Sequence, residues 1–261
     1  MRKLFLAAAL LLTFVPQSST ATVLRRTLLA HYTTTAATTA GIPVAYFDAD
    51  ATLRPALRPG APVNRPEDVV LLPYVAEKIA ELNAQGYFVA IVSNQAGIPK
   101  FAQFDSVDAG LQRTVELIGL NGAVVNMYDF AEFYDGDRKP GTGMFERVDQ
   151  FLTAQFGQGV DKSRSFMVGD AGWMQAAKGN PADTRPEGTD GFSHSNTDRL
   201  AAENFGIPFM EAAPFFGWTT RLGERAIDDL ADLQRVWAAH PELVPPSGQC
   251  GPLLQPASTT P

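Results

Sequence analysis

The stretch Ile42-Pro-Val-Ala-Tyr-Phe47 is followed at once by Asp48-Ala-Asp-Ala-Thr52. The first six residues form a short apolar run, and such a run that ends in a polar turn is typical of a buried central strand. Two carboxylates and a hydroxyl group therefore stand at the point where this strand ends. In an open parallel sheet, that edge is where ligands bind.

Strands and helices are expected to alternate along the rest of the domain. Pro73 opens an amphipathic stretch that Gly86 stops, which is the usual helix asymmetry. The apolar patterns predict further strands at 87–92, 123–127, 165–168 and 206–210, and further helices at 107–118, 144–156 and 197–205. This alternation predicts an α/β fold with a doubly wound parallel sheet.

Polar residues gather at the carboxyl ends of four of the predicted strands. They are Asp48, Asp50 and Thr52 after the first, Ser93 and Asn94 after the second, then Lys139 and Asp170. This set suits phosphoryl transfer, because one carboxylate can attack phosphorus while a second protonates the leaving oxygen and later deprotonates water. A hydroxyl and an ammonium group can hold the phosphoryl oxygens. Carboxylates from different strands attract a hard, oxygen-preferring cation, which indicates Mg²⁺.

Four motifs resemble those of phosphatases of the haloacid dehalogenase superfamily. They are Asp-Ala-Asp-Ala-Thr-Leu at 48–53, Val-Ser-Asn-Gln-Ala-Gly-Ile at 92–98, Arg-Lys-Pro-Gly-Thr-Gly-Met at 138–144 and Val-Gly-Asp-Ala-Gly at 168–172. The sequence is most similar to the polynucleotide 3′-phosphatase branch, the phosphatase half of polynucleotide kinase/phosphatase. The resemblance implies a Rossmann-like fold with at most a small cap.

The resemblance also implies an activity. It is that of a Mg²⁺-dependent phosphomonoesterase that works through an aspartyl-phosphate and removes 3′-phosphates from nucleic-acid ends, as in DNA repair. By the same resemblance, Asp48 is the nucleophile and Asp50 the general acid/base, while Ser93 and Lys139 bind the phosphoryl group. Thr52 orients the first loop and, with Asn94, belongs to the substrate-binding part of the site.

The implied metal ligands are the carboxylates of Asp48 and Asp170 and the main-chain carbonyl of Asp50. Asp198 is expected to support the metal site from behind these ligands. One departure concerns Ala51, because the family usually has glycine before the motif threonine. Glycine tolerates backbone angles that alanine does not, so the geometry of this loop is expected to differ.

Composition keeps a second interpretation open. The net charge of −7 and the pI near 5.0 give no overall basic footprint, which favours a small-molecule phosphatase on the same scaffold, such as one for sugar bisphosphates. Relatives of that kind often carry a Cys/His zinc loop, and the single cysteine, Cys250, excludes a site with several thiolates. A receiver-type signalling domain and an inactive binding module both fit the paired aspartates less well.

The N-terminus is typical of a secretory signal peptide, with Arg2 and Lys3 before an apolar run from Leu4 to Val15 and a cut after Ala21. The run is too short for a permanent membrane span. The absence of acidic residues before Asp48 leaves an organellar or intracellular location as the alternative. The expected organisation is a signal peptide at 1–21, a linker at 22–41, the phosphatase domain at 42–218, a helix at 219–240 and a flexible Pro-rich tail at 241–261. The protein is expected to be a monomer.

Several side chains near the motifs have two interpretations. Arg54, Arg58 and Arg65 are expected in a solvated loop, with contact to a phosphate backbone as the alternative. His194 lies in the loop that is a candidate for substrate contact, and a substrate role is its less favoured interpretation. Core packing or loop anchoring is expected, rather than stacking on bases, for five aromatic residues: Trp173, Phe192, Phe215, Phe216 and Trp218.

Overall fold

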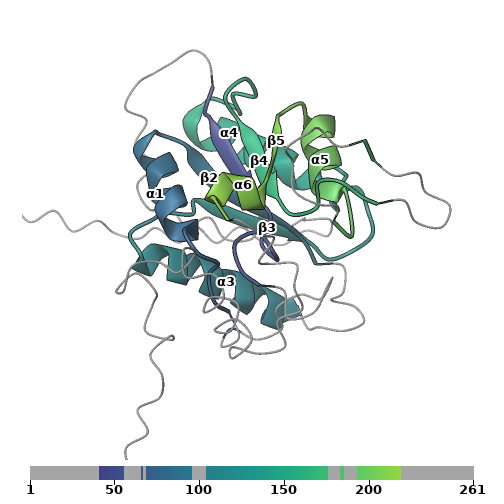
Figure 1. Cartoon of the computed structure of the whole chain (residues 1–261). Helices are drawn as coiled ribbons and strands as arrows, with labels where there is room; N and C mark the ends of the chain where they lie inside the picture. Colours follow the sequence, from purple (N-terminus) through teal and green to yellow (C-terminus); the bar gives the residue numbers. More distant parts are fainter. Residues whose placement is uncertain are drawn as a thin grey trace, which may run out of the picture.

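The computed structural model describes residues 41–55, 66, 69–95, 104–175, 183–184 and 193–218. Within them, one parallel sheet has the strand order β3-β2-β1-β4-β5 (Figure 1). The strands are β1 (Val44–Phe47), β2 (Phe88–Asn94), β3 (Met127–Ala131), β4 (Phe166–Gly169) and β5 (Phe209–Glu211). The strand that precedes Asp48 therefore lies at the centre of the sheet, as predicted.

Helices cover both faces of this sheet. One face packs against α1 (Val75–Ala84), α3 (Phe104–Leu120) and α6 (Ala212–Phe216), and the other packs against α4 (Gly143–Phe156) and α5 (Thr197–Phe205). Side chains of β1 alternate between the two cores, with Phe47 in the first and Tyr46 in the second. A strand buried on both faces reads as a continuous apolar run. The doubly wound α/β fold is thus confirmed.

The third strand lies further along the chain than predicted. It was expected at 123–127, but β3 spans Met127–Ala131. The reason is Asp129, a buried carboxylate in the middle of the strand that is paired with Arg147 of α4, with 2.6 Å between Oδ2 and Nε. A charged residue interrupts the apolar run by which a buried strand is recognised, and the partner that permits its burial is distant in sequence. The short helix α6 was also not predicted.

Several predictions concern residues outside the described part of the chain. They are the signal peptide, nearly all of the linker, the helix at 219–240, the tail at 241–261, and Arg58, Arg65 and Phe192. The small cap also stays a prediction, because 56–65 and 96–103 are not described. Among the helices that are described, none combines the length and apolar character needed to cross a bilayer.

Candidate active site

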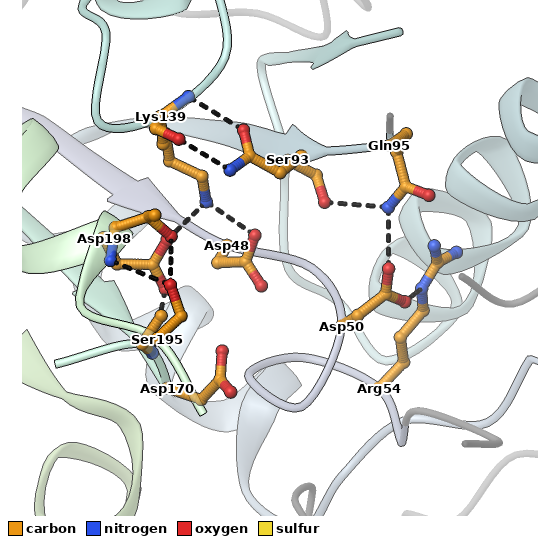
Figure 2. A network of polar contacts seen from close by, with 12 residues as sticks. Asp48, Asp50, Arg54, Ser93, Gln95, Lys139, Asp170, Ser195 and Asp198 are labelled. Atoms are coloured by element: carbon orange, nitrogen blue, oxygen red, sulfur yellow. Dashed lines mark hydrogen bonds and ion pairs between the residues drawn. The ribbon is translucent and has the colours of Figure 1, made fainter. Parts of the chain in front are cut away.

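Three carboxylates converge at the carboxyl edge of the sheet (Figure 2). Asp48 follows β1, Asp170 follows β4, and Asp198 lies in the first turn of α5. One oxygen from each lies within 4.8 Å of the others, and all three residues are buried. Asp198 was expected behind the metal ligands, whereas the structure places its carboxylate beside those of Asp48 and Asp170.

Lys139 is the cation of this cluster. Its Nζ lies 2.7 Å from Oδ1 of Asp48 and 2.7 Å from Oδ1 of Asp198, and only 1% of its side chain is exposed. The ammonium group therefore touches the predicted nucleophile directly and bridges it to a residue of α5. Charge-assisted hydrogen bonds of this kind are short and orient both partners.

The charges of the cluster are not balanced. Burial raises the pKa of Asp48 to about 7; Lys139 opposes this shift, and the carboxylates of Asp198 and Asp50 add to it. Burial alone would lower the pKa of Lys139, but Asp198 and Asp48 outweigh it and raise that pKa above its usual value. Three carboxylates facing one ammonium group fit a hard divalent cation, because Mg²⁺ prefers oxygen ligands and its charge would offset theirs. The donor set thus agrees with the predicted Mg²⁺ site.

Gly169 makes room for Asp198. A Cβ atom at position 169 would lie 2.3 Å from Oδ2 of Asp198, which is far inside van der Waals contact. The same Oδ2 accepts a hydrogen bond from the main-chain N–H of Ala171 at 3.1 Å. Asp198 is therefore held by the loop after β4 as well as by Lys139, and this loop could not approach so closely with any larger residue at position 169.

Asp50 faces away from the three carboxylates (Figure 2). Its Oδ1 accepts a hydrogen bond from Nε of Arg54 at 2.8 Å, and its Oδ2 accepts one from Nε2 of Gln95 at 2.6 Å. The Gln95 amide also donates to Oγ of Ser93 at 3.0 Å. Gln95 thus links the predicted general acid/base to the predicted phosphoryl-binding hydroxyl. The role of the Asp50 carbonyl as a metal ligand stays a prediction.

The two residues assigned to substrate binding both contact the protein itself or are buried in the described structure. Asn94 uses its side-chain amide on the main chain of Lys139, accepting from its N–H at 2.8 Å and donating to its carbonyl at 3.0 Å. Thr52 is fully buried, and its hydroxyl makes no hydrogen bond with the described residues. Both placements suit residues that shape loops, as expected of Thr52, and the role of Asn94 in substrate binding stays a prediction.

The loop that joins Asp50 to Thr52 has the backbone conformation that the family's glycine would favour. Ala51 has a φ of 63°, in the left-handed region where residues with a Cβ are disfavoured. Its N–H donates to the carbonyl of Arg54 at 2.7 Å, which closes the turn after β1. Ala51 therefore adopts the same turn, and its backbone bears the steric strain of a positive φ.

Arg54 corrects an expectation. It was expected in a solvated loop, but it is fully buried and paired with Asp50. Neither Arg54 nor Gln95 was identified as a site residue from the sequence. The spacing of four between Asp50 and Arg54 was a usable signal, although it is usually associated with helices rather than turns.

The remaining candidates lie outside the carboxylate cluster. His194 is half exposed, with Nδ1 4.0 Å from Oδ2 of Asp170. The guanidinium carbon of Arg199 lies over the Trp173 ring, 4.2 Å from the ring centroid, as expected of an aromatic residue that anchors a loop. Phe216 and Trp218 are buried and belong to the core beside α1 and α3.

Comparisons with known proteins find phosphatases. A family model described as polynucleotide kinase 3 phosphatase matches residues 43–216. D-glycero-D-manno-heptose-1,7-bisphosphate 7-phosphatase of Thermosynechococcus vestitus is 31% identical over 144 residues, which cover 49% of this chain and 69% of the relative. D-glycero-beta-D-manno-heptose-1,7-bisphosphate 7-phosphatase of Rhodopseudomonas palustris is 33% identical over 121 residues, covering 41% and 63%.

A solved structure supports the fold. D,D-heptose 1,7-bisphosphate phosphatase from B. bronchiseptica, complexed with magnesium and phosphate, superposes with a TM-score of 0.50 at 18% identity. The match covers 76% of this chain and 99% of that structure. The family match includes every strand of the sheet and all three carboxylates of the cluster. The chain therefore belongs to the polynucleotide kinase 3 phosphatase family, and it is a phosphatase of the haloacid dehalogenase superfamily.

Proposed function

We propose that this protein is a Mg²⁺-dependent phosphomonoesterase for small phosphate esters, with sugar bisphosphates as the first class to test. The observation that carries the proposal is the buried contact of 2.7 Å between Lys139 and Asp48 inside a cluster of three carboxylates. The names of the two curated relatives, which are both heptose-bisphosphate phosphatases, support the substrate class. The solved relative complexed with magnesium and phosphate supports the metal.

The carboxylates of Asp48, Asp170 and Asp198 would hold the metal ion. When bound, Mg²⁺ supplies positive charge that offsets the phosphate dianion and orients its oxygens. Lys139 and the Ser93 hydroxyl donate hydrogen bonds to the phosphoryl oxygens as their charge develops. Ser93 lies near the end of β2 and Lys139 in the loop before α4, and two donors from separate elements favour a fixed orientation of the phosphoryl group.

The reaction then proceeds in two steps. A carboxylate oxygen of Asp48, which Lys139 favours in its ionised form, bonds to phosphorus while the ester P–O bond breaks. Asp50 gives its proton to the leaving oxygen. In the second step, Asp50 takes a proton from water, the water oxygen bonds to phosphorus, and the acyl-phosphate bond breaks to restore Asp48.

A second candidate substrate is the 3′-phosphate of a polynucleotide. The description of the matching family over 43–216 favours it. The net charge of −7 argues against it, because polyanions are attracted by basic surfaces. The two candidates share the mechanism and differ only in what surrounds the phosphate.

The experiment is phosphate release from a sugar bisphosphate and from a 3′-phosphorylated oligonucleotide at matched phosphate concentration, with Mg²⁺ or with chelator. Asp48→Asn is the control, and we expect it to lose at least about 10³-fold in kcat/KM because no nucleophile remains. Preference for the sugar ester supports the proposal, and preference for the oligonucleotide replaces it with the second candidate. Release that is unchanged in Asp48→Asn would overturn the mechanism.

We also propose that the protein is exported, to the periplasm or out of the cell, because its N-terminal residues have the pattern of a secretory signal peptide. Mass spectrometry of the protein purified from its native source would then give an N-terminus near Thr22. Recovery of the intact N-terminus at Met1 would overturn this proposal.

A further inference from the structure

We propose that Arg54 is a positioning residue for the phosphatase reaction, which holds the carboxyl group of Asp50 in the orientation for proton transfer. The inference rests on the proposed role of Asp50 as general acid/base. It concerns a residue that none of the family motifs in the sequence assigns to the reaction.

The Arg54 side chain joins the site loop to a helix. Its Nε donates to Oδ1 of Asp50 at 2.8 Å, and its Nη1 donates to Oγ1 of Thr114 in α3 at 3.1 Å. The Thr114 hydroxyl in turn donates to the carbonyl of Gly110 at 2.9 Å. The guanidinium is therefore fixed at one end by α3, which is a rigid element of the fold, and presents its other end to Asp50 (Figure 2).

The main chain of Arg54 closes the loop that carries Asp50. The carbonyl of Arg54 accepts from the N–H of Ala51 at 2.7 Å, and its N–H donates to the carbonyl of Ala49 at 3.1 Å. Asp50 thus lies inside a turn that one residue ties together through both its side chain and its main chain. Movement of Arg54 would move Asp50 with it.

Two donors hold the carboxyl group, one on each oxygen. Gln95 takes Oδ2 at 2.6 Å while Arg54 takes Oδ1. One donor alone would leave the group free to rotate about its Cβ–Cγ bond, because terminal torsions of this kind are broad. With both donors in place, the plane of the carboxyl group is fixed, and a proton on it has a defined direction.

A contribution to the stability of the fold does not explain why Arg54 is buried beside Asp50. Arg54 has no exposed surface, and burying a guanidinium carries a desolvation cost that its ion pair does not reliably recover. Its Nη2 is buried and makes no hydrogen bond within the described residues. A buried charge with an unsatisfied donor is destabilising, which points to a role in the reaction rather than in folding.

The chemistry supplies a test that separates position from stability. In the first step, an Asp48 oxygen bonds to phosphorus, the ester bond breaks, and the Asp50 proton passes to the leaving oxygen. A basic alkoxide needs that proton, whereas p-nitrophenolate leaves readily without it. Loss of Asp50 orientation should therefore slow alkyl esters much more than p-nitrophenyl phosphate.

The experiment compares kcat/KM for glycerol 3-phosphate and p-nitrophenyl phosphate in Arg54→Met, because this parameter reports the step that forms the aspartyl-phosphate. We expect a loss of about 100-fold for the alkyl ester and less than about 5-fold for the aryl ester. Arg113→Met removes a neighbouring arginine of α3 that pairs with Glu116 at the surface, and it should change neither value. Asp50→Asn should show the same split between the esters as Arg54→Met.

Thr114→Val serves as a second variant if Arg54→Met does not fold. It keeps the guanidinium and removes its anchor, so the same split should appear at about 3-fold to 10-fold. Equal losses on both esters in the Arg54 and Thr114 variants, with a split in Asp50→Asn, would overturn the role of Arg54 alone. Absence of a split in Asp50→Asn would overturn both this inference and the proposed role of Asp50.

Discussion

The side-chain amide of Asn94 makes two hydrogen bonds with the main chain of Lys139. Its Oδ1 accepts from the Lys139 N–H at 2.8 Å, and its Nδ2 donates to the Lys139 carbonyl at 3.0 Å. Asn94 ends β2, and Lys139 belongs to the loop before α4. The end of one strand therefore fixes the backbone from which the ammonium group reaches Asp48. Asn94, the residue after Ser93, therefore affects the site by holding the main chain of Lys139.

Asn94→Ala should therefore weaken both the fold and the site. We expect the free energy of unfolding to fall by about 1 to 3 kcal/mol, because the two main-chain groups of Lys139 lose their partner. Urea denaturation measures this, and kcat/KM for a phosphate ester should fall in parallel. If KM alone rises and the unfolding curve stays unchanged, Asn94 contacts the substrate instead.

Metal-free protein should lose stability as the pH rises from 3.8 to about 7, because the pKa of Asp48 is raised over that interval in the folded state. The folded state binds the proton more tightly than the unfolded state, so the stabilisation is complete at low pH and disappears above the folded pKa. The full effect is on the order of 4 kcal/mol. Urea unfolding in chelator at pH 5 and pH 8 measures the larger part of this effect, about 2 to 3 kcal/mol.

Asp48→Asn is the control for this pH dependence, since it removes the titrating group and should flatten the difference between the two pH values. Mg²⁺ should raise the melting temperature of the wild-type protein more at pH 8 than at pH 5, because protons compete for the same carboxylate. An equal dependence on pH in the variant and the wild type would show that Asp48 is not its source.

Ala51→Gly should stabilise the protein. At a φ of 63°, the alanine bears a steric cost that glycine avoids, so the free energy of unfolding should rise by about 0.5 to 1 kcal/mol. Ala49→Gly is the matched control in the same loop; Ala49 is buried and has no positive φ, so its replacement should lower stability. A loss of stability in Ala51→Gly equal to that of the control would contradict the strain.

Gly169→Ala should damage the site through Asp198. The new methyl group would lie 2.3 Å from Oδ2 of Asp198 and would force that carboxylate away from Lys139 and Ala171. We expect Mg²⁺ affinity and kcat/KM to fall about 10-fold to 100-fold. Gly119→Ala in α3, where a Cβ meets nothing within 4 Å, should leave both unchanged. Wild-type metal affinity in Gly169→Ala would remove Asp198 from the metal site.

The fold could be predicted from the sequence where burial followed composition. The run before Asp48 is apolar because β1 is covered on both faces, and α4 and α5 were predicted almost to the residue. β3 was misplaced because Asp129 is buried against Arg147, a contact that no local pattern reports. Apolar periodicity records burial, and it is silent about polar groups that are buried in pairs.

The residues of the site also divide into those that the sequence pattern placed correctly and those that it did not. Asp48, Ser93 and Asp170 stand where strands end, so topology alone brings them together, whereas Lys139 reaches them from the loop between β3 and α4. Asp198 could not be placed in the cluster in this way, because it enters from the first turn of a helix. Arg54 was assigned to solvent because its position follows the motif within a turn, and only the fold of that turn brings its guanidinium to Asp50.

The central position of β1 also bears on how activity returns after denaturation. Asp48 and Asp198 are separated by more than half the length of the chain, and Lys139 reaches both from a third loop. Contacts between residues so distant in sequence form late, after the entropy of closing long loops has been overcome. Enzymatic activity should therefore recover more slowly than helical structure during refolding, and it serves as a reporter of the completed sheet.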